Sequence, residues 1–364
     1  MKAPFPYFGG KSKVSHVIWS ALGSDVKNYV EPFAGSLATL LLRPGGAGKI
    51  ETVNDYDGLL ANVWRAMKYD PDGVAEHADN PVNECDLHAR HLWLVGQRES
   101  ITDRLMGDPE FYDARAAGWW IWGACAWIGS GWCSGNGPWV AVDGVLTDRR
   151  KIPHLGDSGR GINRQIPHLG DSGQGINRQI PHLGGSGRGI NRALRNAVGS
   201  RSQYIKDEFS KLASRMRGVR VACGDFERVL SPAVTTRNGL TGVFLDPPYD
   251  AGNDDPYHTS SSGVSARARE WAMNNGGNPL LRIVMAGYAG EHDGSEFNRL
   301  GWRCVSWKAG GGYGNQANGR GKENANREVL WLSPSCLRFD ESAGPEKLVA
   351  ESTSRHQFGI FNSE

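Results

Sequence analysis

Seven short apolar segments constrain the fold of this chain more than any other feature of its sequence. Most are dense in Val, Ile and Leu and lack the alternation of apolar and polar residues that a half-exposed strand shows. Such runs are typical of buried parallel strands covered by helices on both faces, and the last two resemble a closing hairpin. The segments cover residues 27–35, 48–55, 219–225, 242–249, 281–288, 302–310 and 327–334.

Helix-like segments separate some of these strands. Residues 59–70 carry apolar side chains at helical spacing, and residues 266–275 do so more weakly. Strands that alternate with helices predict a doubly wound α/β sheet. The alternation stops near residue 71 and resumes near residue 219, which predicts an insertion the size of a small domain. We therefore divide the chain into residues 1–70, the insertion 71–218, residues 219–336 and a tail 337–364.

The insertion has two unusual parts besides the helices expected at 88–98 and 200–217. Residues 117–139 are rich in Trp, and because most of these Trp residues lie in an apolar run, a small core is favoured over stacking on bases. Residues 152–193 hold three copies of a 14-residue repeat that begins IPHLG. Each copy has one His without a partner His or Cys and lacks the calcium-binding GGxGxD pattern, so we predict no metal site.

Charge is distributed unevenly along the chain. The whole sequence has 41 basic and 39 acidic residues, which excludes a uniformly basic nucleic-acid coat. Residues 149–220 alone hold 15 Lys and Arg against four Asp and Glu, a net charge of +11. This segment indicates a surface for a polyanion, with a solvated loop face as the alternative. The basic or base-reading side chains there, predicted to contact DNA, are Arg149, Arg150, Arg160, Arg164, Gln174, Arg178, Arg188 and Arg192.

The cysteine pattern and hydropathy give only general expectations. The six cysteines are scattered without a CxxC pair, which favours reduced thiols in a cytosolic protein. The first residues lack the apolar core of a signal peptide, and no run of 18 apolar residues occurs. We therefore expect a cytoplasmic protein without a membrane span.

The strongest chemical signal is the tetrapeptide Asp246-Pro247-Pro248-Tyr249, which follows the strand GVFL. In an open α/β sheet, ligands bind beyond the carboxyl ends of the strands. The carboxylate and the backbone carbonyls of this segment offer hydrogen-bond acceptors, the prolines stiffen it, and Tyr249 offers a flat ring. A planar substrate with an amino group suits this set better than the alternative of a simple Asp-Pro-Pro turn.

Three further motifs lie where strands end or near the N-terminus. In YVEPFAGS, Glu31 ends a strand and Phe33, Gly35 and Ser36 form a turn in which glycine permits close approach to a ligand. Asp55 follows about 20 residues later, the spacing expected of an acid that binds ribose hydroxyls. The other two motifs are PYFGGK, with Tyr7 and Lys11, and CGDF, with Asp225 and Phe226 placed to bind and pack on a purine.

Together these motifs resemble the Dam-type S-adenosylmethionine-dependent DNA adenine-N6 methyltransferases, in their alpha order of motifs. The resemblance covers residues 1–70 and 219–334. It implies a class I methyltransferase fold, a doubly wound seven-stranded mixed sheet with an inserted target recognition domain at 71–218. It also implies the cofactor S-adenosyl-L-methionine, with S-adenosyl-L-homocysteine as product, and an adenine flipped out of double-stranded DNA. Asp246, Pro247, Pro248 and Tyr249 would be catalytic. The residues that would bind the cofactor are Tyr7, Lys11, Glu31, Phe33, Gly35, Ser36, Asp55, Asp225 and Phe226.

The sequence departs from the family at Leu37, which stands where the family has its second glycine. A side chain there would crowd the methionine moiety or shift the turn, and we expect a tolerated variant. The alternatives are an RNA adenine or DNA cytosine-N4 methyltransferase, disfavoured by Asp246, and a non-catalytic DNA-binding protein with this fold. We expect a solitary enzyme of the bacterial or prophage kind, at the nucleoid, with a homodimer on a palindromic site as one possible assembly.

Overall fold

The computed structural model describes residues 1–7, 9–127, 132–133, 139–142, 145–148, 201–248, 263–288, 294–306 and 328–339. The strands are β1 (Asn28–Glu31), β2 (Ile50–Asp55), β3 (Trp139–Val142), β4 (Val145–Asp148), β5 (Val219–Cys223), β6 (Thr241–Leu245), β7 (Leu281–Tyr288), β8 (Arg303–Ser306) and β9 (Glu328–Leu332). The helices are α1 (Ser15–Leu22), α2 (Ala38–Leu41), α3 (Gly58–Tyr69), α4 (Pro71–Ala78), α5 (Glu84–Gly107), α6 (Ala114–Ala126), α7 (Arg201–Met216), α8 (Val264–Asn275) and α9 (Gly294–Arg299). Short 3-10 turns are η1 (Lys11–Lys13), η5 (Phe226–Val229) and η6 (Thr236–Asn238).

Seven strands form one mixed sheet in the order β5-β2-β1-β6-β7-β9-β8. The first five strands in this order are parallel, and β9 is antiparallel to both of its neighbours. The chain leaves β1 toward β2 on one side and reaches β6 on the other only much later, so the crevice for a ligand is expected at the ends of β1 and β6. This is the α/β fold predicted from the sequence, a mixed seven-stranded sheet consistent with a class I methyltransferase.

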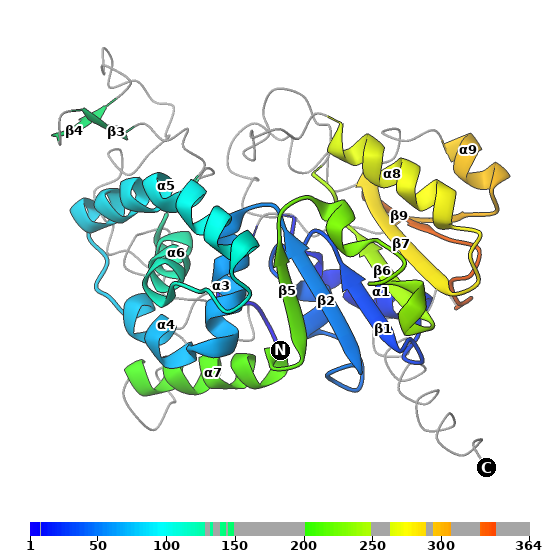
Figure 1. The fold of residues 1–364 in the computed structure, drawn as a ribbon, viewed down its shortest axis with the longest axis horizontal. Coiled ribbons are helices and arrows are strands. Elements are labelled where there is room, and N and C mark those ends of the chain that lie inside the picture. The colour runs from blue at the N-terminus through cyan, green and yellow to red at the C-terminus, as the bar shows by residue number, and fades with distance from the viewer. Residues whose placement is uncertain are drawn as a thin grey trace, which may run out of the picture.

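Helices cover both faces of the sheet. Successive strand residues point to opposite sides, so each strand contributes to the core on both faces. Tyr29 and Phe244 belong to a large core shared with α1 and with α3 to α7. Val30 and Val243 belong to a second core with η5, α8 and α9. In Figure 1, α3 to α7 gather beside β5, and α8 and α9 lie near the other edge of the sheet.

The predicted strands are all present, whereas the helices between residues 71 and 126 are more extensive than predicted. The helix expected at 88–98 is the central part of α5, which continues for 24 residues. Helix α4 had no counterpart in the prediction, although Asp70 caps its first turn by accepting from Gly73 N at 2.9 Å and Pro71 occupies its first position. These are recognisable start signals for a helix.

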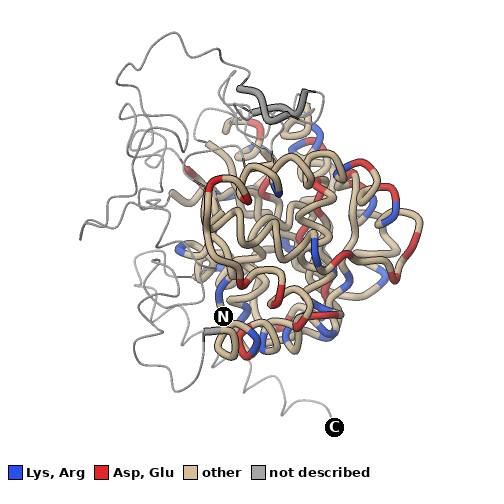
Figure 2. The backbone as a smooth tube through the Cα atoms, turned by 90° about the vertical axis from the view of Figure 1, so that its left-hand side faces the viewer, with Lys and Arg blue, Asp and Glu red and all other residues tan. Residues whose placement is uncertain are grey.

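The helices of the predicted insertion pack directly on the sheet domain. Leu94 of α5, Trp120 of α6 and Phe209 of α7 lie in the same core as the strands. Trp120 and Trp122 are both buried, which confirms a core role for these two members of the Trp-rich segment. Figure 2 shows the backbone on the side of the molecule that these helices form, with acidic and basic residues interspersed along it. The division into cofactor-binding, recognition and catalytic parts stays a prediction.

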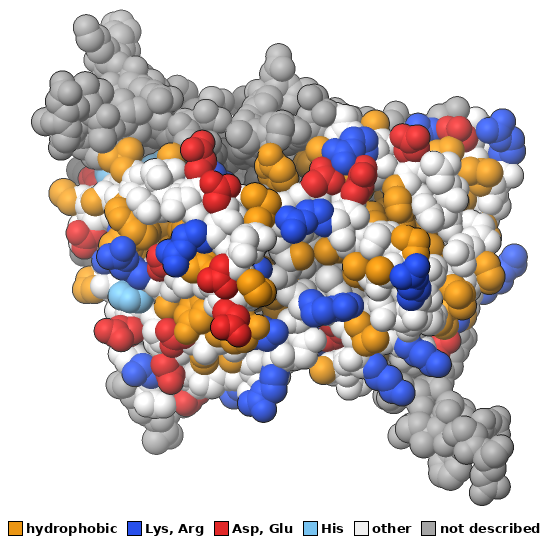
Figure 3. Space-filling view, in the orientation of Figure 1, with side chains coloured by type: hydrophobic (Ala, Val, Ile, Leu, Met, Phe, Trp, Pro, Cys, Tyr) orange, Lys and Arg blue, Asp and Glu red, His pale blue; other side chains and the backbone are white. Residues whose placement is uncertain are grey.

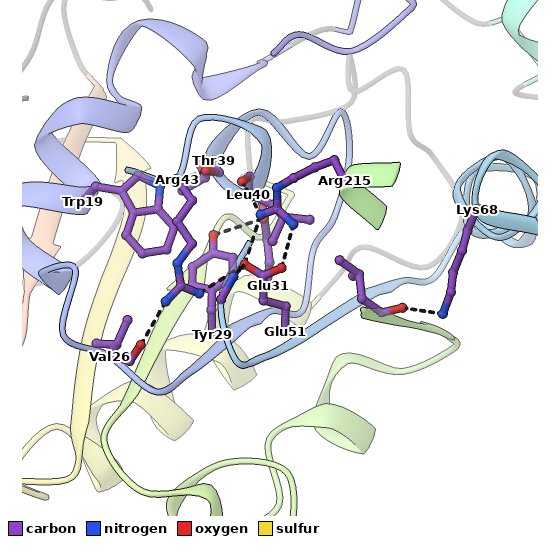
Figure 4. A network of polar contacts seen from close by, with 12 residues as sticks. Trp19, Val26, Tyr29, Glu31, Thr39, Leu40, Arg43, Glu51, Lys68 and Arg215 are labelled. Carbon is purple, nitrogen blue, oxygen red and sulfur yellow. Dashed lines mark hydrogen bonds and ion pairs between the residues drawn. The ribbon is translucent and has the colours of Figure 1, made fainter. Parts of the chain in front are cut away.

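A buried ion network fixes α7, the helix that ends the insertion, to the sheet (Figure 4). Glu51 of β2 accepts from Arg215 Nη1 at 2.6 Å and from Arg43 Nη1 at 3.1 Å, and all three side chains are at most 8% exposed. Arg215 also donates to the carbonyl of Leu40, and Arg43 to that of Val26, both at 2.9 Å. Because the buried charges are paired and also hydrogen-bonded, the network tolerates its desolvation. In the part of the chain described, no helix has the length and apolarity needed to cross a bilayer.

Candidate active site

The candidate residues gather along one edge of the sheet. Glu31 ends β1, Asp55 ends β2, Asp225 follows β5 and Asp246 follows β6. These four strands are parallel, so their carboxyl ends meet at the same edge. Residues that are up to 215 positions apart in the sequence, from Glu31 to Asp246, are thereby brought to one place. Figure 3 shows acidic, basic and hydrophobic side chains interspersed over the face of the molecule seen in Figure 1.

An ion pair joins the N-terminal motif to the DPPY motif. Lys11 Nζ lies 2.9 Å from Asp246 Oδ1 and 3.9 Å from Glu328 Oε2, and it donates to the carbonyl of Gly9 at 2.9 Å. The Lys11 side chain is 4% exposed, so the pair is shielded from water on the lysine side. Burial raises the pKa of Glu328, and Asp246 raises it further, whereas Lys11 lowers it. Glu328 is a site residue that the sequence reading missed, because it opens the last strand far from every motif.

Glu31 is a buried acid beside this pair. Its Oε2 accepts from the Tyr29 hydroxyl at 3.0 Å (Figure 4), and only 3% of the residue is exposed. Burial raises the pKa of the Glu31 carboxyl to about 8, the Tyr29 hydrogen bond lowers it, and the charge of Asp246 raises it. Asp246 and Glu328 both face Lys11, and the charge of Asp246 also acts on Glu31, so three acids lie near one another at the ends of β1 and β6 and the start of β9. A positive charge brought to this point would favour the ionised forms of these acids, so they suit a cationic ligand.

Asp55 ties the end of β2 to the turn after β1. Its Oδ2 accepts from Gly35 N at 3.0 Å and its Oδ1 from Asp57 N at 2.9 Å. Burial raises the pKa of Asp55 to about 7, although the bond from Gly35 lowers it. The acid predicted for ribose hydroxyls therefore also holds the glycine turn in place.

Gly35 permits the close contact between this turn and the N-terminal motif. Its φ is +48°, and a Cβ built on it would lie 2.8 Å from Tyr7 Cε1. Its carbonyl accepts from Trp64 Nε1 at 2.9 Å. Nearby, a Cβ on Gly10 would lie 3.4 Å from the Ser36 hydroxyl, so the second glycine of the PYFGGK motif is also in close approach. Position 35 thus needs glycine for a steric reason, whereas an added Cβ on Gly10 would make only a tight contact.

Gly35→Ala is expected to destabilise the protein by about 2 kcal/mol, from left-handed backbone strain plus displacement of the Tyr7 ring. Gly46→Ala is the matched control, because Gly46 also has positive φ, +83°, with nothing within 4 Å of an added Cβ. Urea unfolding of both variants measures the difference. Equal losses of unfolding free energy in the two variants would show that the contact with Tyr7 contributes nothing to stability.

Phe33 and Phe226 form an aromatic pair between the turns after β1 and β5. Their ring centroids are 5.1 Å apart with a tilt of 30°. Arg267 of α8 lies over Phe226 at 5.0 Å and donates to both carboxylate oxygens of Asp225 at 3.0 Å. It also donates to Glu227 at 2.7 Å. Arg267 was missed from the sequence, since only the fold brings α8 against the CGDF motif.

Leu37 takes up the backbone conformation that glycine usually provides. Its φ is 53° and ψ is 26°, and its N–H donates to the carbonyl of Ala34 at 2.8 Å. The side chain is 0% exposed and belongs to the large core under the sheet. The left-handed turn is therefore kept, and the side chain that was expected to crowd the site or shift the turn is placed in the core.

Several predicted residues lie outside the described part of the chain. Pro247 is buried and Pro248 is half-buried, both directly after Asp246. Tyr249 is outside the described residues, as are all eight side chains predicted to contact DNA: Arg149, Arg150, Arg160, Arg164, Gln174, Arg178, Arg188 and Arg192. Their roles stay predictions.

Residues 7–90 match the family described as D12 class N6 adenine-specific DNA methyltransferase. The match includes the site residues from Tyr7 to Asp55 and ends before the CGDF and DPPY motifs. It indicates a DNA adenine-N6 methyltransferase. A search of curated proteins found no match.

Proposed function

We propose that this DNA adenine-N6 methyltransferase takes its methyl group from S-adenosyl-L-methionine and transfers it to an adenine flipped out of double-stranded DNA. The single observation that carries the proposal is the Lys11–Asp246 ion pair of 2.9 Å. It joins the segment matched to the methyltransferase family with the DPPY motif, which lies outside the match. The two motifs thus contribute to one site at the switch point of the sheet.

The residues present fit the proposed cofactor. S-adenosylmethionine supplies an electrophilic methyl group on a positively charged sulfur. Asp246 and Glu328 beside Lys11, with buried Glu31 close to Asp246, suit a cation at this point. Phe33 is half-buried and packs on buried Phe226, so this aromatic pair would border the purine, and Asp55 offers a carboxylate for ribose hydroxyls. The wall of the site between the aromatic pair and Asp55 would be formed by Tyr7, Gly35 and Ser36.

The chain's own residues would orient the target. The Asp246 carboxylate and the Pro247 carbonyl accept hydrogen bonds from the adenine amino group, and the stiff Pro-Pro segment holds both acceptors in place. These bonds increase the electron density on the amino nitrogen and direct its lone pair for in-line attack, while Tyr249 stacks on the ring. Alignment is the main contribution to rate expected from such a site. Lys11 would hold the Asp246 carboxylate in place by pairing with it.

The insertion is proposed to recognise DNA. The net charge of +11 over residues 149–220 suits phosphate contacts, and Arg or Gln after Ser-Gly in each repeat suits base edges. A homodimer on a palindromic site, a solitary bacterial or prophage origin and a place at the nucleoid remain part of this proposal.

The decisive experiment is incubation of purified protein with S-adenosylmethionine and unmodified duplex DNA, followed by mass spectrometry of the nucleosides. We expect N6-methyladenine and no N4-methylcytosine, with RNA and single-stranded DNA as parallel substrates. Methylation of RNA alone, or of cytosine, would support the other enzyme hypotheses. No transfer to any nucleic acid, with DNA still bound, would support the non-catalytic protein.

Changing Arg160, Gln174 and Arg188 together to alanine is expected to weaken DNA binding or alter the methylated site, because these side chains occupy the variable position of the three repeats. Gel-shift titration and sequencing of methylated plasmid measure the two effects, and S-adenosylmethionine affinity serves as control. Unchanged DNA affinity and site choice would make the repeats scaffold only.

A further inference from the structure

The side chain of Asn54 joins both neighbours of β2 at the point where the strands end. Asn54 is 1% exposed, and its Nδ2 donates to the carbonyl of Pro32 at 3.1 Å and to that of Gly224 at 2.9 Å. Strand β2 lies between β1 and β5 in the sheet. One amide group therefore connects the turn after β1 with the turn after β5, across the strand that carries it.

An NH2 group suits both contacts of Asn54. Two carbonyl oxygens face the same nitrogen, so the NH2 group must point at them, and a carboxylate would place an acceptor against two acceptors. Removing the amide would leave two carbonyls at the strand ends without this donor. The orientation of Asn54 is thus set by its surroundings.

The two joined carbonyls belong to residues directly beside candidate cofactor contacts. Pro32 precedes Phe33, and Gly224 lies two residues before Phe226, so the amide spans the base of the aromatic pair. Backbone bonds complete the connection, with Ala34 N donating to Asn54 O at 2.8 Å and Gly224 N to Asp55 O at 3.0 Å. These bonds tie together the two turns that carry the aromatic side chains.

We infer that Asn54 is a positioning residue for the cofactor site, which sets the gap between the turns that carry Phe33 and Phe226. The inference rests on the proposed function and deepens it, because it assigns cofactor affinity to a side chain that need not touch the cofactor. Misplacing a binding group by a fraction of an ångström lowers affinity without removing any contacting residue.

Asn54→Ala and Asn62→Ala form a matched pair of variants. Asn62 of α3 is also buried, and it also makes two hydrogen bonds to the backbone of a distant segment, with Asp113 O and Asp113 N, both at 2.8 Å. Its contacts join α3 to α6, away from the strand ends. We expect both variants to lose thermal stability. Only Asn54→Ala should raise the Kd and the KM for S-adenosylmethionine, about tenfold, with kcat within about twofold of wild type.

A double-mutant cycle separates positioning from general loosening. In a Phe226→Leu background, Asn54→Ala should weaken S-adenosylhomocysteine binding by less than it does in wild type, because the two residues act on the same surface. If the alanine variant does not fold, Asn54→Ser retains one donor and should weaken binding by an intermediate factor. Calorimetric titration of each protein provides the Kd values.

The possible results distinguish failure of the inference from failure of the proposed function. Unchanged affinity in Asn54→Ala, or equal weakening in Asn62→Ala, would overturn the inference while the proposed function stands. A fully additive cycle with Phe226→Leu would also overturn it. If wild-type protein does not bind S-adenosylmethionine at all, the proposed function fails first and the inference fails with it.

Discussion

Replacing Asp246 by alanine is expected to lower kcat about 10³-fold, while S-adenosylmethionine still binds. The reason is that the Asp246 carboxylate would accept a hydrogen bond from the target amino group as the nitrogen attacks, and alanine provides no acceptor. Single-turnover methylation of an oligonucleotide duplex measures the chemical step, and calorimetry measures the cofactor affinity. Methylation at the wild-type rate would remove Asp246 from the catalytic set.

Asp246→Ala also removes the acid closest to buried Lys11. A separate control variant measures how much the loss of an acid near Lys11 lowers activity. Glu328→Ala removes the other acid near Lys11, which lies 3.9 Å away. This variant should keep kcat within about tenfold of wild type, because Glu328 is not expected to reach the adenine. If both variants lost activity equally, Asp246 would act only by pairing with Lys11.

Glu31→Gln is expected to make the protein more stable than wild type at high pH and to change the stability little at low pH. Burial raises the pKa of Glu31 in the folded protein to about 8, from an ordinary value of 4.5. Stability from the neutral, buried carboxyl is therefore fully present below pH 4.5 and is lost as the pH rises through 8. Glutamine stays neutral throughout, so the advantage of the variant should grow to on the order of 4 kcal/mol by pH 9.

Urea unfolding of wild type and Glu31→Gln between pH 5 and 9 tests this prediction, since other titrating groups contribute equally to both proteins. Tyr29→Phe offers a second check. The Tyr29 hydroxyl lowers the pKa of Glu31, so its removal should move the loss of stability to higher pH. A difference between wild type and Glu31→Gln that does not vary with pH would mean that Glu31 is ionised throughout the range.

The strands and the site edge were predictable from the sequence, because they depend on local signals. Apolar runs located all seven strands of the main sheet, and the motifs at their ends located Glu31, Asp55, Asp225 and Asp246. The extent of α5 was not predicted, because only the central part of this 24-residue helix was recognised as helical. Its full length is visible only once it packs on α3 and α6.

The missed site residues share a different cause. The contacts are with partners far away in the sequence for Glu328, Arg267 and Asn54. No residue type or spacing predicts such a contact. Asn54 directly precedes the predicted site residue Asp55, yet its proposed role depends on carbonyls that directly follow both neighbouring strands. Sequence patterns specify which element a residue occupies, whereas these roles require the strand order.

Replacing Leu37 by glycine in the turn after β1 is expected to destabilise the protein. A glycine there would relieve about 1 kcal/mol of left-handed strain but would forfeit a fully buried leucine, a loss of several kcal/mol. The side chain of Leu37 fills part of the large core, so glycine at this position would cost more stability than the relieved strain returns.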